Sequence, residues 1–346
     1  MLARSTSALV ESAQRLTELI PRSRLDPAVL AWGERASRRS RWGVGFSGGP
    51  DSLALLLLVW SHWPARRKQI VALHFDHRLR GVESWADARF CRRVCRTLGV
   101  PFVAASWAQG RPGASEAEAR AARHAFFARH SRIMWLGHQQ DDIAETLLMR
   151  LARGSGTAGL AAPRPVQLLG TRRVNLRPLL GLKKAELVRA LREAGVEWRE
   201  DSSNAGPAYL RNRMRHQVVA RWVKAAERDA VAGAARSREL LEEDDAALEA
   251  WVRELDPLDR AGCLVRRRLA GRPMALWRRA LHLWLMRNLP EADLSRQAFD
   301  ALLRGVVAGG RLRQSVGTSH FAECRGDLLM LVSRAAKPAR IRRSAN

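Results

Sequence analysis

Short apolar runs alternate with amphipathic helical patterns through the first half of the chain. The runs that predict strands lie at residues 43–46, 70–75, 102–105 and 133–137. The helical patterns between them lie at residues 52–60, 84–98, 115–130 and 141–153. Strands that alternate with helices of this length predict an α/β fold with a doubly wound parallel sheet. In such sheets ligands bind beyond the carboxyl ends of the strands.

The rest of the chain is predicted to be mostly helical. A Pro-containing stretch at 163–178 predicts an irregular or hairpin connection, and a helix follows from Lys183 to about Ala194. The patterns then predict five parts: a helical lead-in, an α/β domain, a long helical linker, a small and mainly helical C-terminal domain with short strands near its end, and a basic disordered tail. Their bounds are 1–40, 41–217, 218–255, 256–334 and 335–346.

Basic residues strongly outnumber acidic ones. The chain holds 60 Lys and Arg against 34 Asp and Glu, a formal net charge of +26, which favours a polyanionic partner such as a nucleic acid. Its four cysteines include no CxxC pair, which is typical of a protein from a reducing, cytoplasmic compartment. The longest apolar run, 53–60, is too short to cross a bilayer, so we expect no membrane association.

The most informative motif is Ser47-Gly48-Gly49-Pro50-Asp51-Ser52, where an apolar strand stops and an apolar helix begins. Glycines allow positive φ angles and close backbone approach, so consecutive N–H groups can converge on one anion, and two serine hydroxyls add donors. The helix N-terminus adds its positive dipole end. The motif has neither the P-loop spelling nor the dinucleotide GxGxxG spelling. We predict a polyphosphate site here; an ordinary glycine turn is the alternative.

Polar residues also stand at the end of the second predicted strand. His74 lies near the end of its run, and Asp76 and His77 follow the run. Beside a phosphate site they could bind Mg²⁺ or contact a nucleotide, and a merely polar strand end is equally compatible with the local sequence.

The end of the fourth predicted strand carries a denser cluster. His138 precedes Asp141 and Asp142 at a helix start, and Glu145 follows one turn later. Capping alone would explain one aspartate. Two carboxylates and a histidine at the mouth of a sheet that already holds a phosphate loop favour a metal or catalytic site.

Two helical segments carry arginines whose role the local sequence leaves open. Glu116 and Arg120 lie one turn apart, as in a solvated salt-bridged helix or a functional one. Arg211, Asn212 and Arg215 open another helix, where they suit contacts to nucleic-acid phosphates or form only a basic helix start.

Taken together, these motifs resemble one family. The loop resembles the SGGxDS loop of the N-type ATP pyrophosphatases, also called the PP-loop family. The whole set, in order over about residues 40–217, closely resembles the tRNA(Ile)-lysidine synthetases. The motifs are Ser47–Ser52, Asp76–Arg80, Glu116–Arg123, Gly137–Thr146, Arg177–Leu180, Asp201–Asn204 and Arg211–Arg215. Two departures are His124, where the family usually has Tyr, and Gln139-Gln140, where His-Leu or similar is usual; beyond the long helix little aligns.

The resemblance implies an adenine nucleotide α-hydrolase-like fold and an AMP-forming ligase. Such an enzyme uses ATP and Mg²⁺ to adenylate C2 of the wobble cytidine in a tRNA(Ile) with a CAU anticodon. Free L-lysine then attacks C2, giving lysidine, AMP and pyrophosphate. The small C-terminal domain would contact the tRNA, and a homodimer is left open.

The resemblance also assigns residues to roles. ATP binding falls to Ser47, Gly48, Gly49, Pro50, Asp51, Ser52, Asp76 and His77. The catalytic residues are His138, Asp141 and Asp142, of which the two aspartates either bind Mg²⁺ or accept a proton from the lysine amine. Glu116, Arg120 and Glu145 support them. The tRNA contacts are Arg177, Arg211, Asn212 and Arg215.

Three alternatives remain at this stage. A tRNA thiolase of the same superfamily would need a CxxC pair or an iron–sulfur cluster, whereas Cys91 and Cys95 have the wrong spacing on a helix predicted to lie away from the strand ends. An amidotransferase-like relative would need a glutaminase domain or an ammonia source. A catalytically inactive RNA-binding relative would keep the basic surface without the chemistry.

Overall fold

The computed structural model describes residues 2–76, 82–107, 115–170, 172–199, 210–290 and 294–333, without the side chains of 2–7, 82–84 and 116. Contacts divide the chain into two compact units, Met1–Glu242 and Glu243–Asn346. The division falls inside one helix, α11 (Ala230–Leu255), within the segment expected to link two domains. None of the helices in the described ranges is long and apolar enough to cross a membrane.

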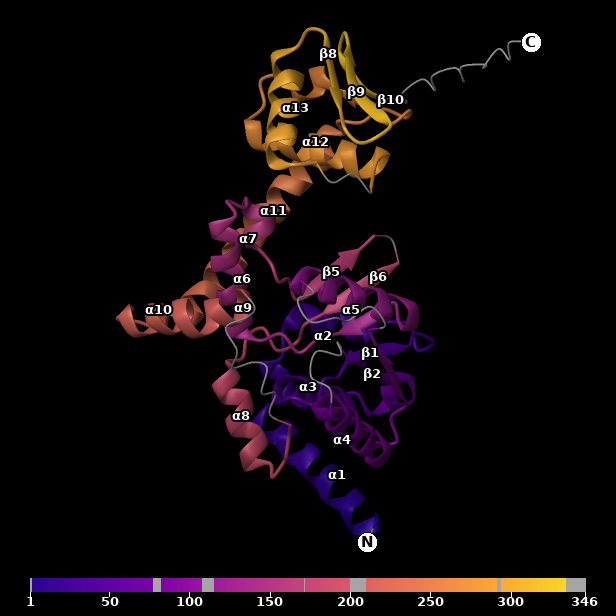
Figure 1. The fold of residues 1–346 in the computed structure, drawn as a ribbon, viewed down its shortest axis with the longest axis vertical. Coiled ribbons are helices and arrows are strands. Elements are labelled where there is room, and N and C mark those ends of the chain that lie inside the picture. The colour runs from indigo at the N-terminus through magenta and orange to yellow at the C-terminus, as the bar shows by residue number, and fades with distance from the viewer. Residues whose placement is uncertain are drawn as a thin grey trace, which may run out of the picture. The chain divides into compact units, whose positions relative to one another are not determined.

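A six-stranded sheet of order β3-β2-β1-β4-β6-β5 forms the centre of the first unit, which runs from indigo through magenta to the salmon helices α9 (Leu210–Arg213) and α10 (Ala220–Ala225) in Figure 1. The strands are β1 (Trp42–Gly45), β2 (Ile70–Asp76), β3 (Phe102–Ser106), β4 (Ile133–Trp135), β5 (Val166–Leu169) and β6 (Arg173–Leu176). All neighbouring pairs are parallel except β5 and β6, which form the expected hairpin. The predicted doubly wound parallel sheet is therefore confirmed.

The strand order reverses between β1 and β4. The chain builds outward from β1 to β2 and β3, then returns to place β4 on the other side of β1. A crevice forms at such a reversal, because the connections leave the two neighbouring strands in opposite directions. The loops after β1 and β4 therefore open beside each other.

Helices cover the two faces of this sheet. Their bounds are α1 (Leu2–Leu19), α2 (Pro27–Arg35), α3 (Pro50–His62), α4 (Val82–Leu98), α5 (Glu116–His130), α6 (Gln140–Ala152), α7 (Thr157–Leu160) and α8 (Lys184–Glu193). α1, α3, α4 and α8 share one apolar core with alternate strand residues such as Trp42 and Val44. α5 packs on the other face, where Phe126 and Phe127 meet Val71 and Leu73.

The long helical pattern after residue 210 is divided in the structure. α9 (Leu210–Arg213) runs through a π-helical segment (Met214–Val219) into α10 (Ala220–Ala225), and α11 begins only at Ala230. Asp229 ends the break, because its carboxylate accepts the N–H of Ala232 and pairs with Lys183. A capping aspartate of this kind favours a new helix start over a continuous helix.

The second unit, the orange to yellow part of Figure 1, combines helices with a sheet. Its helices are α12 (Met274–Asn288) and α13 (Arg296–Ala308). The short strands expected near the end belong to a four-stranded antiparallel sheet of order β7-β10-β9-β8. The strands are β7 (Leu264–Val265), β8 (Leu312–Ser315), β9 (His320–Arg325) and β10 (Leu328–Ser333).

One buried ion pair joins α11 to α12 within this unit. The Asp245 and Arg279 side chains are 2% and 10% exposed, and Arg279 also pairs with Glu249. Removal of Asp245 leaves the buried Arg279 guanidinium with Glu249 alone, whose side chain is largely exposed to solvent. We expect Asp245→Ala to lower the free energy of unfolding by about 3 kcal/mol. Urea denaturation measures this, with Asp244→Ala at the exposed neighbouring position as the control; equal stabilities would contradict it.

Candidate functional site

The loop after β1 is closed by its two serines. The Ser47 N–H donates to Ser52 Oγ at 3.2 Å, the two hydroxyl oxygens lie 3.0 Å apart, and Ser52 Oγ donates to the Gly49 carbonyl at 3.0 Å. Gly48 adopts a φ of +93°, which only glycine adopts without strain. The N–H groups of the first turn of α3 have no partner inside the helix, so the loop and the helix start present donors to an anion.

Gly137, just after β4, lies against the backbone of this loop. A Cβ at Gly137 would sit 2.9 Å from the carbonyl oxygen of Asp51 and 3.3 Å from the Ser52 nitrogen. No side chain fits there without moving the loop. The sequence analysis gave Gly137 no role of its own, since its need for glycine arises from a contact between segments 86 positions apart.

Asp51 is a buried carboxylate without a bonding partner for one oxygen. Its Oδ1 is buried and accepts no hydrogen bond from the described residues. Burial raises the pKa of Asp51 to about 6, while Lys184 opposes the rise and Asp142 adds to it. A carboxylate left in this state fits a cation or a proton, and it points to the position where a ligand would complete the site.

His138 is held as a neutral imidazole by Arg177. The Arg177 Nε–H donates to His138 Nδ1 at 3.1 Å, which places the imidazole proton on Nε2. Burial holds the pKa of His138 well below its usual range, and the nearby Arg177 and Arg211 add to this effect. Asp142 opposes it. His138 can therefore donate a hydrogen bond from Nε2, but it is a poor acid at neutral pH.

The two adjacent aspartates at the start of α6 diverge. Asp142 accepts the Gln139 N–H at 3.0 Å and pairs with Arg211 at 2.6 Å. Asp141 accepts the N–H of Lys184, the first residue of α8, at 2.9 Å. The two carboxylates are thus held by different partners, and the prediction that they bind Mg²⁺ stays a prediction. Among the described residues, no group of three or more His, Cys, Asp or Glu side chains could hold a metal ion.

Asp142 stays ionised despite its burial. Burial raises the pKa of its carboxyl, but Arg211, His138, the Gln139 N–H and Arg215 together outweigh that effect and lower the pKa. It is accordingly a weak base.

Glu145 ties α6 to the helix that begins at α9. Its side chain is 1% exposed, and its two carboxylate oxygens accept Nε–H groups from Arg211 and Arg215. Residues four apart on a helix lie on one face, so both arginines point inward at α6. Buried charges without such pairing would be costly.

These contacts change the interpretation of the predicted tRNA-binding arginines. Arg211 and Arg215 are bound to carboxylates, Asn212 is 8% exposed, and Arg177 is 2% exposed. Their direct contact with tRNA therefore stays a prediction. Arg211 and Arg215 have the predicted spacing, but they lie on one helix face and form an internal ion-pair cluster with Asp142 and Glu145.

Of the other predicted residues, some lie where they were expected and some lie outside the described part of the chain. Asp76 ends β2, at the carboxyl edge of the sheet, as expected. His77, the side chain of Glu116 and the motif at 201–204 lie outside the described residues. Arg120 lies on α5 and lines a cavity together with Arg177.

This cavity, which we call the basic cavity, lies between α5 and the strands β4, β5 and β6. It encloses about 300 Å³. Its basic residues are Arg120, Arg132, Arg173 and Arg177, together with His124. The sequence analysis assigned nothing to Arg132 or Arg173. The signal was available in the run Arg173-Val174-Asn175-Leu176-Arg177, whose alternation of polar and apolar residues predicts a strand with one polar face.

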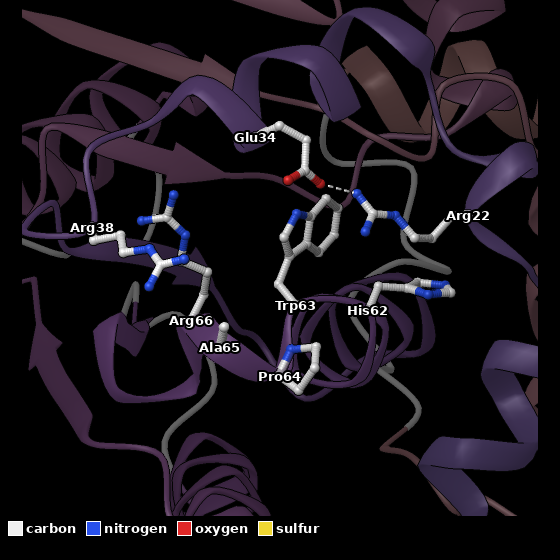
Figure 2. A pocket seen from close by; sticks show the side chains of 8 residues that line it. All are labelled: Arg22, Glu34, Arg38, His62, Trp63, Pro64, Ala65 and Arg66. Carbon is white, nitrogen blue, oxygen red and sulfur yellow. Dashed lines mark hydrogen bonds and ion pairs between the residues drawn. The ribbon is translucent and has the colours of Figure 1, made fainter.

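A second cavity, of about 220 Å³, lies at the opposite end of α3 from the phosphate loop. Figure 2 shows Trp63 at its centre, with the Glu34 carboxylate bound to Arg22 beside the indole. The Nε1 of Trp63 is buried and has no partner among the described residues. Because it lies at the amino ends of the strands, this cavity is separate from the site at their carboxyl ends.

Cys91 lies beneath the phosphate loop rather than away from the strand ends as predicted. A Cβ at Gly48 would be 3.1 Å from the Cys91 Sγ. The Cys91 side chain is fully buried, and burial raises the pKa of its thiol. A protonated, inaccessible thiol is not suited to sulfur transfer.

Comparisons with known proteins agree with this geometry. A family model described as a PP-loop domain matches residues 13–222. A tRNA(Ile)-lysidine synthase of Solibacter usitatus is 43% identical over 192 residues, 53% of this chain and 42% of the relative. A tRNA(Ile)-lysidine synthase of Geobacter sulfurreducens is 36% identical over 277 residues, 74% of this chain and 56% of the relative. The chain spans about half the length of these curated relatives.

A solved structure of a U34-tRNA thiolase from Methanococcus maripaludis is also similar. It has a TM-score of 0.48 and 15% identity, covering 68% of this chain and 79% of that one. A likeness this low carries no argument about function.

The burial of Asp51 predicts a pH-dependent effect on stability. Its folded pKa of about 6 lies above the ordinary 3.8, so its contribution is present at low pH and is lost as the pH rises through 6. Asparagine stays neutral. Asp51→Asn should therefore stabilise the free protein by about 2 kcal/mol at pH 7.5 and by nothing near pH 4. Chemical denaturation at both pH values measures this.

The control is Glu193→Gln, at an exposed position on α8. A gain at pH 7.5 that is equal for both variants, or one that persists at pH 4, would contradict the assignment to Asp51.

Proposed function

This chain belongs to the PP-loop domain family, whose members bind ATP, and on that premise we propose that it is an ATP-dependent tRNA(Ile)-lysidine synthetase. In this proposal it joins free L-lysine to C2 of the wobble cytidine of a CAU-anticodon tRNA(Ile). The reaction passes through an adenylated cytidine and releases AMP and pyrophosphate. The relatives from Solibacter and Geobacter bear the name of this activity and support it.

The observation that carries the proposal is the junction of the phosphate loop with the end of β4. The loop presents N–H and hydroxyl donors to an anion, and Gly137 brings His138 and the α6 carboxylates beside it. An adenylating enzyme needs a triphosphate and an acceptor base at one place. The reversal of strand order between β1 and β4 supplies that place.

Residues 47–52 are proposed to hold the ATP phosphates. Ser52 Oγ donates to the Gly49 carbonyl, so Ser47 supplies the proton between the two hydroxyls and can turn it toward a phosphate. Gly48 is fixed from behind by the Arg199 N–H, which donates to its carbonyl at 3.1 Å. The loop is thereby formed before the ligand arrives, which lowers the ordering cost of binding.

The residue best suited to hold Mg²⁺ is Asp51. Its buried Oδ1 accepts no hydrogen bond within the described part of the chain, and carboxylate oxygen is a preferred ligand of this ion. When bound, Mg²⁺ neutralises charge on the phosphates that separate during adenylation. We do not extend this role to Asp141 and Asp142, whose carboxylates diverge.

His138 and Asp141 are proposed to serve the two steps at the base. The Nε2–H of His138 is a donor suited to the cytosine C2 oxygen, and Arg177 orients it. The lysine amine must lose protons as the C–N bond forms. Asp142 is too weak a base for this, since Arg211 and its other neighbours lower its pKa, which leaves Asp141 for the step.

The position of Gly137 gives a test of the loop. Gly137→Ala places a methyl group 2.9 Å from the Asp51 carbonyl oxygen and must displace the loop. We expect ATP to bind about ten-fold more weakly, because donors that hold a phosphate act only at hydrogen-bond distance. Calorimetric titration with Mg²⁺–ATP measures this. The control is Gly181→Ala, at a glycine with open space around it; equal affinities for both variants would exclude the contact.

The activity itself is tested by transfer of label from lysine to tRNA. Purified protein with ATP, Mg²⁺, labelled lysine and a CAU transcript of tRNA(Ile) should incorporate label, and a transcript without the wobble cytidine should incorporate none. Ser47→Ala should lower the rate about a hundred-fold, the usual effect of losing one donor to developing charge. Ser61→Ala, at the far end of α3, is the matched control.

The outcomes separate the alternatives. Release of AMP that depends on tRNA, without incorporation of lysine, would keep the adenylating chemistry and overturn lysine as the nucleophile. Binding of tRNA without any exchange of pyrophosphate into ATP would identify an inactive RNA-binding relative.

A further inference from the structure

The basic cavity concentrates positive charge without acidic side chains in its wall. Of its thirteen lining residues, all within the described ranges, four are Arg, one is His, and none is Asp or Glu. Arg132 and Arg173 are exposed at its surface, whereas Arg177 is 2% exposed. In the ion-pair cluster at α6, by contrast, Arg211 and Arg215 each pair with a carboxylate.

Burial and this positive charge lower the pKa values of two side chains in the cavity wall. Burial, followed by Arg120, Arg123, Arg177 and Arg173, lowers the pKa of His124 to about 4. Burial and then Arg120 lower the pKa of Arg177 to about 10. The arginines add to the effect of burial on His124, and a bound anion would offset their part of it.

Arg177 itself is bonded to neutral acceptors. It donates to the Arg164 carbonyl at 2.7 Å, to Gln167 Oε1 at 2.7 Å and to His138 Nδ1 at 3.1 Å. These bonds satisfy its donors without cancelling its charge. Arg177 therefore joins the cavity to the imidazole proposed to meet the cytosine.

The sheet explains why the cavity is open. On β6, Val174 and Leu176 face the main core, so Arg173, Asn175 and Arg177 face the α5 side. α5 packs on β1, β2 and β4, and its residues Arg120, His124 and Ala128 line the cavity together with the polar face of β6. A polar strand face beside a helix forms the groove.

The chemistry of the wall selects the ligand. Free lysine carries a net positive charge and would be repelled, and the triphosphate has its own donors in the loop after β1. An RNA strand offers phosphates at regular spacing, and phosphate contacts from arginine position a strand without reading its sequence.

We propose that the basic cavity binds a backbone phosphate of the tRNA, with Arg132 and Arg173 as its contacts. This inference rests on the proposed function and deepens it. The phosphate enters from the exposed end, and the wall leads along Arg177 to His138. Arg177 acts as a positioning residue, since it reaches the base only through the imidazole.

The experiment measures binding of an anticodon stem-loop RNA to the full chain, without ATP or lysine. Arg132→Glu and Arg173→Glu should each weaken binding about ten- to hundred-fold, the range for a hydrogen bond to a charged group. Each should also reduce the slope of log affinity against log salt concentration by about one. The controls are Arg129→Glu and Arg172→Glu, at exposed neighbouring positions outside the cavity.

A second measurement follows the His124 imidazole by NMR at pH 6. A phosphate in the cavity offsets the positive charge of Arg120 and Arg123 on α5, Arg173 on β6 and Arg177 beyond it, so RNA should increase the protonated fraction of His124. A variant that merely unfolds would lose the free-protein spectrum as well. Inorganic pyrophosphate at matched concentration separates a small-anion site from an RNA site.

Two results would overturn the proposal, and a third would separate it from the proposed function. Equal losses for the cavity variants and the control variants would overturn the proposal, and so would a His124 signal that answers to pyrophosphate but not to RNA. Because binding is measured without chemistry, a failed lysine transfer with intact effects of Arg132 and Arg173 would refute the proposed function and leave the RNA contact standing.

Discussion

The close approach of Gly137 to the Asp51 backbone is the constraint on which the rest of the site depends. It allows the ends of β1 and β4 to meet, so that one loop brings phosphate donors and the other brings His138 and the α6 carboxylates. A side chain at this point would separate the two halves by displacing a helix N-terminus. The site therefore depends on an absent Cβ as much as on any functional group.

The same site handles its charges in two ways. On α6, Asp142 and Glu145 are bound by Arg211 and Arg215, so buried carboxylates stay ionised and the following helix is held in place. At Asp51, burial acts without a partner for Oδ1 and raises the pKa to about 6. Paired charges of the first kind stabilise the frame, whereas the unpaired one leaves a position for a ligand.

The two faces of β6 also differ, since one carries apolar residues and the other carries basic residues. Val174 and Leu176 of β6 complete the main core, while Arg173 and Arg177 on the opposite face line the basic cavity. The basic residues behind the net charge of +26 therefore act in two different ways. Some of them neutralise internal carboxylates, and others lie in the wall of the basic cavity, where none of the described lining residues is Asp or Glu.

Local sequence determined the architecture and the phosphate loop of this protein. Alternating apolar runs and helical patterns predicted the parallel sheet, and Ser47–Ser52 predicted its anion site, because strand pairing, helix starts and glycine turns depend on near neighbours. Tertiary structure alone decided which charges meet. It turned Arg211 and Arg215 inward, separated Asp141 from Asp142, and brought Arg132 beside Arg173. Residues far apart in the chain acquire such partners only when strands and helices pack, and no local pattern records that distance.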